Sequence, residues 1–291
     1  MSGLTGSDSV RRTPLTIDEI VEFSERGFVR PGRILDESQL ERLRLALEQA
    51  RKKEQESGRE YDLLDPGFGA AGDKLVNEQG KSVGLLINLW HWNDDFRQVA
   101  FDPVLGRWAA QLIGSRRVRL LEDDAIYKEP GKGGSLMWHQ DFPYWPIAQP
   151  NAVTAWIALD ETTELNGAMR MAVGTHLTGE TLPAAFGTGT PYLQENRPAT
   201  VRPIGDPEKL GYEIVPIELQ AGEVSLHHAL TWHASGSNET TSPRRAFVVR
   251  YVGDGTIWLG SRRYEDYKLP TEPEIAEGDP LSGHYFPIVQ F

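Results

Sequence analysis

The first third of the chain carries apolar residues at helical spacing. Thr16 and Glu19 have the spacing of a capping box ahead of an apolar face, and Gly27 supplies a stop. This pattern predicts an entry helix between Thr16 and Gly27. Leucines at helical spacing after Asp36 predict a second helix, and a stripe of apolar residues predicts a third over Pro103–Ile113.

From about Val118 onward the pattern changes to short apolar or alternating runs separated by Gly, Pro, Asn and Asp. Runs of this kind predict strands. Seven or eight of them favour a mainly β fold with flanking α-helices, a double-sheet jelly roll with the helices on one outer face. The candidate strands are Val118–Leu121, Ala125–Lys128, Leu136–Asp141, Val153–Leu159, Ala168–Val173, Glu223–His228 and Ala246–Val252.

The length of 291 residues fits one domain spanning residues 1–291. Residues 1–13 are polar and predict a loose tail. Residues 178–211 are rich in Gly, Pro and Thr and are longer than an ordinary connection. Because loops of that length are usually functional or disordered, we expect a lid or a surface excursion there.

Composition excludes several classes of site and partner. The chain has no cysteine, so any metal must be held by His, Asp or Glu. Its formal charge of −12 would repel a phosphate backbone, which makes nucleic acid an unsuitable partner and favours a small molecule. The sequence has neither an apolar run long enough to cross a membrane nor an apolar secretory segment. We therefore expect a soluble, cytoplasmic protein.

A candidate metal site lies in and after the predicted strands. Residues two apart in a strand point to the same face, so His139 and Asp141 can both point into the mouth of a barrel. His233, just past another strand, adds a second imidazole. Two His and one carboxylate on one face of an octahedral ion leave three positions open. Such a triplet alone is a weak signal, since a hydrogen-bonded surface His139 and a turn-forming Asp141 explain it equally well.

A candidate anion-binding residue strengthens the chemical interpretation. Arg244 opens the apolar strand Ala246–Val252 and would direct a guanidinium into the same cavity. A planar, permanently charged fork suits the far carboxylate of a dicarboxylic acid. Arg245 should face the opposite side of the strand by alternation.

These residues stand in an ordered set of motifs that resembles the phytanoyl-CoA dioxygenase family of iron(II)- and 2-oxoglutarate-dependent oxygenases. The resemblance covers most of the chain to about Val252. One departure is Ala172–His176, which replaces the family's more usual Pro-Gly-Ser-His form. The matching segments are Leu15–Gly27, Trp138–Asp141, Thr154–Asp160 (TAWIALD), Asn166–His176 (NGAMRMAVGTH), Gly222–Asn238 (GEVSLHHALTWHASGSN) and Pro243–Arg245.

The resemblance implies a double-stranded β-helix, a cupin-like jelly roll, and a set of roles. Iron would bind His139, Asp141 and His233, and O2 and 2-oxoglutarate would be cosubstrates. Substrate oxidation would accompany release of succinate and CO2. The residues implied near 2-oxoglutarate are Arg244, which would bind its far carboxylate, and Gln140, Trp156 and Ser235.

Other residues near the motifs have simpler interpretations. His227 and His228 lie in the strand before His233 and are expected in the core or beside the ligands. The aromatic residues Phe142, Trp145 and Trp90 are candidates for lining a substrate pocket, although dense aromatics more often form core.

Three alternatives to a hydroxylase remain. A halogenating relative would need the carboxylate position emptied, which Asp141 contradicts. A non-catalytic jelly-roll protein that binds a metabolite would not need the intact metal triplet together with Arg244. A zinc hydrolase with two His and one Asp would leave Arg244 without a purpose. The resemblance favours a small-molecule hydroxylase in a biosynthetic pathway and does not choose between hydroxylation, desaturation, epimerisation and cyclisation.

Overall fold

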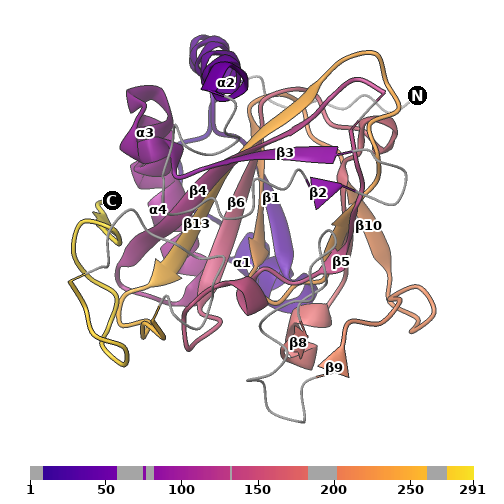
Figure 1. Ribbon diagram of the computed structural model, residues 1–291. Helices are drawn as coiled ribbons and strands as arrows, with labels where there is room; N and C mark the ends of the chain where they lie inside the picture. Colours follow the sequence, from indigo (N-terminus) through magenta and orange to yellow (C-terminus); the bar gives the residue numbers. More distant parts are fainter. Residues whose placement is uncertain (1–8, 58–74, 77–81, 132, 183–201, 261–273) are drawn as a thin grey trace.

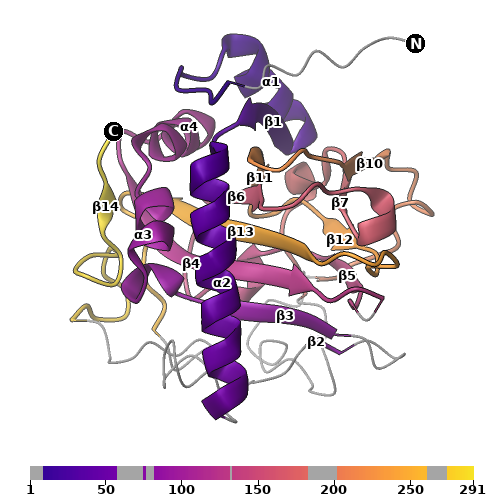
Figure 2. The same ribbon diagram turned by 90° about the horizontal axis from the view of Figure 1, so that it is seen from above.

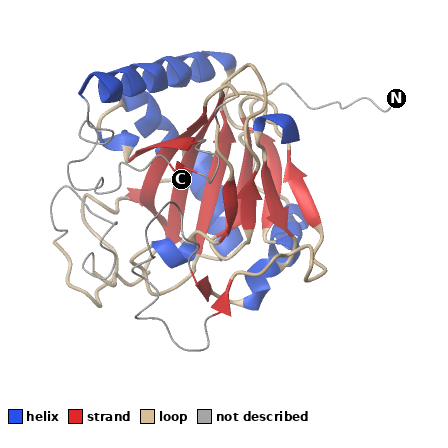
Figure 3. Cartoon of the chain, turned by 45° about the vertical axis from the view of Figure 1, so that its right-hand side comes forward, coloured by secondary structure: helices blue, strands red, loops and turns tan. Residues whose placement is uncertain are grey.

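A computed structural model of the protein describes residues 9–57, 75–76, 82–131, 133–182, 202–260 and 274–291 (Figure 1). Within these ranges no helix is both long and apolar enough to cross a membrane. The α-helices precede most of the strands in the chain, and strands in red fill the centre of Figure 3. The helices are α1 (Ile17–Arg26), α2 (Glu37–Ser57), α3 (Asp94–Ala100) and α4 (Pro103–Ile113).

The predicted helix ends are confirmed by their caps. The Thr16 hydroxyl accepts from the Glu19 backbone N–H at 3.2 Å, and the Glu19 carboxylate accepts from the Thr16 N–H at 2.7 Å. Gly27 ends α1 with a φ of 87°, which an L side chain rarely adopts. Helix α3 was not predicted. Asn93 begins it by accepting hydrogen bonds from two backbone N–H groups of its first turn.

The larger sheet is antiparallel and has eight strands in the described part of the chain. Its order is β1-β11-β6-β13-β4-β3-β2, and β14 adds to β4 near the C-terminus. The strands are β1 (Phe28–Arg33), β2 (Leu75–Val76), β3 (Ser82–Ile87), β4 (Val118–Lys128), β6 (Ala152–Ala158), β11 (Glu223–His228), β13 (Arg244–Gly253) and β14 (Ile288–Val289).

The smaller sheet faces the larger one and completes a double-stranded β-helix, as predicted. Its order is β10-β7-β12-β5, again antiparallel. Its strands are β5 (Leu136–His139), β7 (Met169–Ala172), β10 (Ile214–Ile217) and β12 (His233–Ser235). The sequence did not predict β1, β2, β3, β10, β12 or β14. Of these, β2, β10, β12 and β14 have only two to four residues, and β1 contains two Arg and a Pro.

The two faces of the larger sheet carry different cores. On the outer face, Leu43 and Leu47 of α2 pack with Phe247 and Val249 of β13 in one apolar cluster. Figure 2 shows α2 crossing this face in front of β6, β13 and β4. On the inner face, between the sheets, Trp156 packs in another cluster with methionines of β7. The alternation of strand side chains therefore separates a helix-covered core from the interior of the β-helix.

One expected break in the strands is absent. The segments Val118–Leu121 and Ala125–Lys128, predicted as two strands, are one continuous strand, β4. The intervening acidic residues are buried and have different partners. Asp123 accepts from the backbone N–H groups of Leu89 and Trp90 at 2.7 and 3.0 Å, whereas its two neighbours pair with an arginine on β13. Buried partners thus override the low strand propensity of three consecutive acids.

The expected lid over residues 178–211 is described in part. Residues 183–201 lie outside the described residues. On either side of them, β8 (Thr181–Leu182) and β9 (Arg202–Pro203) pair in parallel. The interpretation as a lid therefore stays a prediction.

Candidate metal centre and anion-binding pocket

Three side chains with metal-binding atoms meet where β5 and β12 pair. His139 is the last residue of β5, His233 is the first of β12, and the two are directly opposite each other across the ladder. Asp141 follows β5 and begins the 3₁₀ turn Phe142–Tyr144. The ligand atoms of the three all lie within 4.8 Å of one another. In the described part of the chain, no other group of His and acidic residues meets this criterion.

The carboxylate reaches the site by a different route from the one expected. The predicted strand Leu136–Asp141 ends at His139, and Asp141 has helical dihedral angles, with φ −74° and ψ −44°. A turn therefore directs the carboxylate to the same place that strand alternation was expected to direct it.

Both imidazoles present the same nitrogen to the site. Nδ1 of His139 lies 2.8 Å from the carbonyl oxygen of Met137, and Nδ1 of His233 lies 3.0 Å from that of Thr231. Because a carbonyl only accepts, each Nδ1 carries the proton and each Nε2 keeps its lone pair for a metal. Burial lowers the pKa of both rings from the ordinary value, which keeps them neutral and able to bind.

The carboxylate of Asp141 is fixed through one oxygen. Oδ2 accepts from the Thr154 hydroxyl at 2.6 Å and lies 3.2 Å from Nε2 of His227, while Oδ1 lies 3.6 Å from Nε2 of His233. Burial alone would raise the pKa of Asp141. The His233 and His227 rings and the Arg250 guanidinium outweigh it and hold that pKa well below its usual range. His227 is thus a support for the ligand, as expected, and Asp141 stays ionised.

A pair of buried cations lies along the same strands. Arg244 on β13 and Lys128 on β4 are directly opposite each other and both have their side chains in the interior. Lys128 Nζ donates to the Ser235 hydroxyl at 2.7 Å and to the carbonyl oxygen of Gly236. Ser235 is two residues beyond His233 in β12, so the cations are joined to the strand that carries a metal ligand.

These cations lack an acidic hydrogen-bond partner among the described residues. Arg244 donates one NH2 to the Gly167 carbonyl at 3.1 Å, and its buried Nε has no partner there. Burial lowers the pKa of Arg244 to about 10, and burial together with the charge of Arg244 lowers the pKa of Lys128 to about 5. Two desolvated cations side by side are costly unless an anion joins them. The cation pair therefore suits the carboxylate of a bound acid.

Gly167 allows its backbone to lie close to this cation pair. Its φ is 83°, and a Cβ there would lie 2.4 Å from the Gly236 carbonyl oxygen and 3.0 Å from Lys128 Nζ. A side chain at this position would therefore collide with the Gly236 backbone and press against the Lys128 ammonium group. This gives a physical role to one glycine of the Asn166–His176 motif.

The other residues expected near the cosubstrate have different surroundings. Trp156 is buried on the inner face, with the Arg244 guanidinium carbon 5.4 Å from its ring centre. Gln140 has protein partners at both ends of its amide. It donates to the carbonyls of Leu230 at 2.8 Å and Gly179 at 2.9 Å, and it accepts from the Thr181 N–H at 2.8 Å. Gln140 thus anchors the segment before residues 183–201 instead of showing a free amide to the pocket.

The aromatic candidates separate into two places. Phe142 and Trp145 share an apolar cluster with Leu230 and Trp258 beside the metal-binding turn. Trp90 packs instead in the cluster under the helices, because the Asp123 carboxylate holds its backbone on the outer side of β4. The structure therefore does not bring Trp90 together with the other two.

A buried charged group near the metal ligands was missed. Arg250 on β13 pairs with Glu122, at 3.4 Å, and with Asp124 on β4, and the Trp145 indole donates to Glu122 at 3.0 Å. Burial raises the pKa of Glu122 to about 7 despite the nearby guanidinium. Strand periodicity carried a signal for Arg250, since it lies six positions after Arg244 and an even spacing places both side chains on the inner face.

Lys128 was missed for a related reason. It ends an apolar run, where a lysine is usually a solvated strand end, and its burial depends on Arg244, Ser235 and Gly167 from other segments. The available signal was that Lys128 lies two positions after Ile126, an apolar residue on the inner face, and so should point to the same face.

Comparison with known proteins gives a family. A model of the phytanoyl-CoA dioxygenase (PhyH) family matches residues 23–246. A probable alpha-ketoglutarate-dependent hypophosphite dioxygenase of Stutzerimonas stutzeri is 32% identical over 149 residues, 51% of this chain and 50% of that protein. The phytanoyl-CoA dioxygenase of Arabidopsis thaliana is 28% identical over 162 residues, 55% and 54% of the two chains. The matched part of the chain thus spans about half the length of these relatives.

Solved structures share the fold over nearly the whole chain. The alpha-ketoglutarate-dependent carbocyclase SnoK from nogalamycin biosynthesis superposes with a TM-score of 0.70 at 23% identity, covering 95% of this chain and 97% of its own. The epimerase SnoN, solved with Fe3+, alpha-ketoglutarate and nogalamycin RO, superposes with a TM-score of 0.70 at 24% identity, covering 94% and 98%. With the family model spanning residues 23–246, the chain belongs to the phytanoyl-CoA dioxygenase family of iron- and 2-oxoglutarate-dependent oxygenases.

Proposed function

We propose that the protein is an iron(II)- and 2-oxoglutarate-dependent oxygenase that oxidises a small molecule and releases succinate and CO2. The observation that carries this proposal is the connection between two sites. The triplet is His139, Asp141 and His233, and the cation pair is Lys128 and Arg244. The two groups are linked through β12, and all five side chains are buried. A metal next to a carboxylate pocket is the arrangement that a 2-oxo dicarboxylic acid requires.

The chain would hold the iron through Nε2 of His139, Nε2 of His233 and Oδ1 of Asp141. This donor set, two imidazoles and a carboxylate, is typical of non-haem iron(II) oxygenases. When bound, iron with 2-oxoglutarate and O2 supplies the oxidising power, and the protein supplies placement and exclusion of water.

The far carboxylate of 2-oxoglutarate would bind Arg244, Lys128 and the Ser235 hydroxyl. The unpartnered Nε of Arg244 supports this, since a charge-assisted contact there satisfies a buried donor. Trp156 would form one wall beside Arg244.

The substrate would enter beside Phe142 and Trp145. Both are on the turn that carries Asp141. The Trp145 indole donates to Glu122, and its ring packs against the Arg250 guanidinium. Apolar walls with a few fixed polar groups suit a small organic molecule. A biosynthetic substrate is supported by the fold shared with SnoK and SnoN, and further relatives carry names of small-molecule dioxygenases, such as the ectoine dioxygenase of Halomonas elongata, 25% identical over 249 residues.

The test is succinate formation by purified protein supplied with iron(II), 2-oxoglutarate and O2, with a panel of small molecules. An oxygenase requires all three and loses turnover in Asp141→Ala. A non-catalytic binding protein would give no succinate under any condition. A zinc hydrolase would be active with zinc and without 2-oxoglutarate. A halogenase would require halide, for which the occupied Asp141 position leaves no ligand site.

A further inference from the structure

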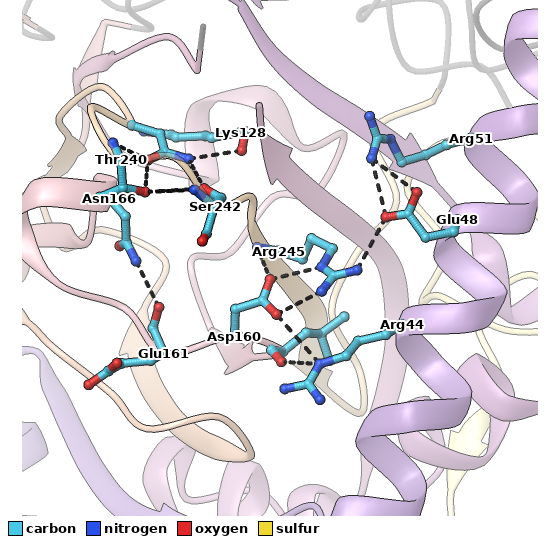
Figure 4. A network of polar contacts seen from close by, with 12 residues as sticks. Arg44, Glu48, Arg51, Lys128, Asp160, Glu161, Asn166, Thr240, Ser242 and Arg245 are labelled. Carbon is cyan, nitrogen blue, oxygen red and sulfur yellow. Dashed lines mark hydrogen bonds and ion pairs between the residues drawn. The ribbon is translucent and has the colours of Figure 1, made fainter. Parts of the chain in front are cut away.

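Figure 4 shows a network of ion pairs between α2 and the ends of neighbouring strands. The network lies on the outer face of the larger sheet, at the ends of β13 and β4 that carry Arg244 and Lys128. Asp160, two residues past β6, binds Arg245 through both carboxylate oxygens, at 2.8 Å each, and also accepts from the Arg245 backbone N–H at 3.0 Å. Arg44 of α2 lies 3.4 Å from the same carboxylate and donates to the Leu159 carbonyl at 2.8 Å.

One face of α2 continues the network. Arg44, Glu48 and Arg51 follow at helical spacing and so share that face. Glu48 lies between cations, 3.2 Å from Arg245 and 3.3 Å from Arg51. Arg51 also pairs with Glu129, the residue after β4, and its guanidinium stands 4.1 Å from the ring centre of Tyr127.

The charges thus alternate from Asp160 through Arg245, Glu48 and Arg51 to Glu129. They tie the ends of β6, β13 and β4 to one helix. Surface ion pairs taken singly add about 0–1 kcal/mol, but a bidentate arginine in a network keeps a fixed geometry.

Two members of the network are the chain neighbours of the two inner cations. Arg245 follows Arg244, and Glu129 follows Lys128. Strand alternation places each outer residue and its inner neighbour on opposite faces, so an outer anchor fixes the backbone from which the inner side chain projects. The Asp160 carboxylate also acts through space, because it raises the pKa of Arg244 against the effect of burial.

We propose that this outer network positions Arg244 and Lys128 for the cosubstrate. When a bound carboxylate favours the charged form of Lys128, two cations stand directly opposite each other in the ladder, and their repulsion opposes close pairing of the ends of β13 and β4. The network holds those ends together from the other face, so that both cations meet one carboxylate. Asp160 and Glu48 are positioning residues, and this inference rests on the proposed function.

The test compares two acids on Mn(II)-loaded protein by calorimetric titration. 2-Oxoglutarate has the far carboxylate, and 2-oxopentanoate has the same carbon chain without it. In Asp160→Asn we expect the affinity for 2-oxoglutarate to fall about three- to tenfold, while that for 2-oxopentanoate stays within about twofold. Glu48→Gln, an exposed change on α2, should shift the ratio of the two affinities in the same direction but less than Asp160→Asn does. Asp160→Glu should bring the ratio part of the way back to the wild-type value.

Asp254→Asn is the matched control. Asp254 follows the opposite end of β13 and binds Arg119 of β4 at 3.0 Å and Arg117 at 2.8 Å. The control therefore breaks a similar ion pair between the same strands, away from the cations. An unchanged ratio in both Asp160→Asn and Glu48→Gln, or an equal change in Asp254→Asn, overturns the positioning role while the proposed function stands. Wild-type protein that binds both acids equally overturns the far-carboxylate site itself, and this inference with it.

Discussion

Lys128 and Arg244 are directly opposite each other across β4 and β13, both buried and both cationic in their usual states. Keeping both side chains charged at opposed ladder positions would oppose folding, and burial together with the charge of Arg244 accordingly lowers the pKa of Lys128 to about 5. Hydrogen bonds to Ser235 and to main-chain carbonyls offset part of this cost. The arrangement is explained by a ligand, because a bound dicarboxylate supplies the missing negative charge.

Replacing Lys128 with methionine should therefore stabilise the ligand-free protein. The lysine has a pKa of about 5 in the folded protein and an ordinary pKa of 10.5, so folding at neutral pH releases its proton at a cost. Wild-type stability should rise with pH between these values, since the unfolded state binds more protons there. We expect Lys128→Met to increase the free energy of unfolding by about 1–3 kcal/mol at pH 7. The variant should also lose the rise of this free energy with pH. Urea unfolding at several pH values measures both effects. A destabilised variant with the slope intact would contradict this.

The same pKa predicts a pH dependence of cosubstrate binding. Lys128 is neutral in the free protein above about pH 5, and a carboxylate beside it would favour the charged form, so binding takes up a proton. The affinity for 2-oxoglutarate should fall as the pH rises from 6 to 8, by up to about tenfold per unit. Titration of metal-saturated protein in buffers of different ionisation enthalpy measures the proton uptake, and in Lys128→Met this uptake should be lost.

Arg244→Ala should mainly weaken 2-oxoglutarate binding. It removes one buried charge-assisted contact, and we expect a loss of about 2–4 kcal/mol in binding free energy, with 2-oxopentanoate unaffected. Arg245→Ala should have a much smaller effect, since its side chain lies on the outer face with Asp160 and Glu48. A larger effect from Arg245 would mean that the register of β13 is wrong by one.

Asp141→Ala should abolish turnover and leave the fold intact. The change removes one of three metal ligands, and we expect the affinity for Mn(II) to fall by at least about a hundredfold. Thr154 and His227 lose a partner, but a buried carboxylate that needs them is removed as well. Circular dichroism checks the fold, and calorimetry checks the metal. Wild-type succinate formation by this variant would refute the ligand assignment.

Much of the site was predictable because it depends on local spacing. His139, Asp141 and His233 come together as expected, and alternation correctly separates Arg244 from Arg245. The reason given for Asp141 was wrong in detail, since a turn and not a strand directs it. Local spacing therefore identified the residues without fixing their backbone geometry.

What the sequence did not predict depends on contacts between distant segments. The break expected within β4 rested on the low strand propensity of three acids, and their partners, including Arg250, lie far along the chain. The burial of Lys128 and the placement of Trp90 away from Phe142 likewise follow from the packing of whole sheets. Even spacing along the strand indicates which face Lys128 and Arg250 share with their neighbours, but it does not identify the distant residues that contact them.

Gln140→Leu tests the connection between the metal-binding strand and the segment before residues 183–201. The Gln140 amide links Leu230, which precedes β12, to Gly179 and Thr181. Leucine would leave the Thr181 N–H and two carbonyls without these partners, and we expect a loss of about 1–3 kcal/mol in the free energy of unfolding. Because His139 and Asp141 flank Gln140, the affinity for Mn(II) should fall too. Gln140→Glu should not restore it, because a carboxylate still accepts from the Thr181 N–H but cannot donate to the carbonyls of Gly179 and Leu230. Thermal unfolding with and without Mn(II) measures both effects, and unchanged metal-dependent stabilisation in Gln140→Leu would show that the segment and the metal centre are independent.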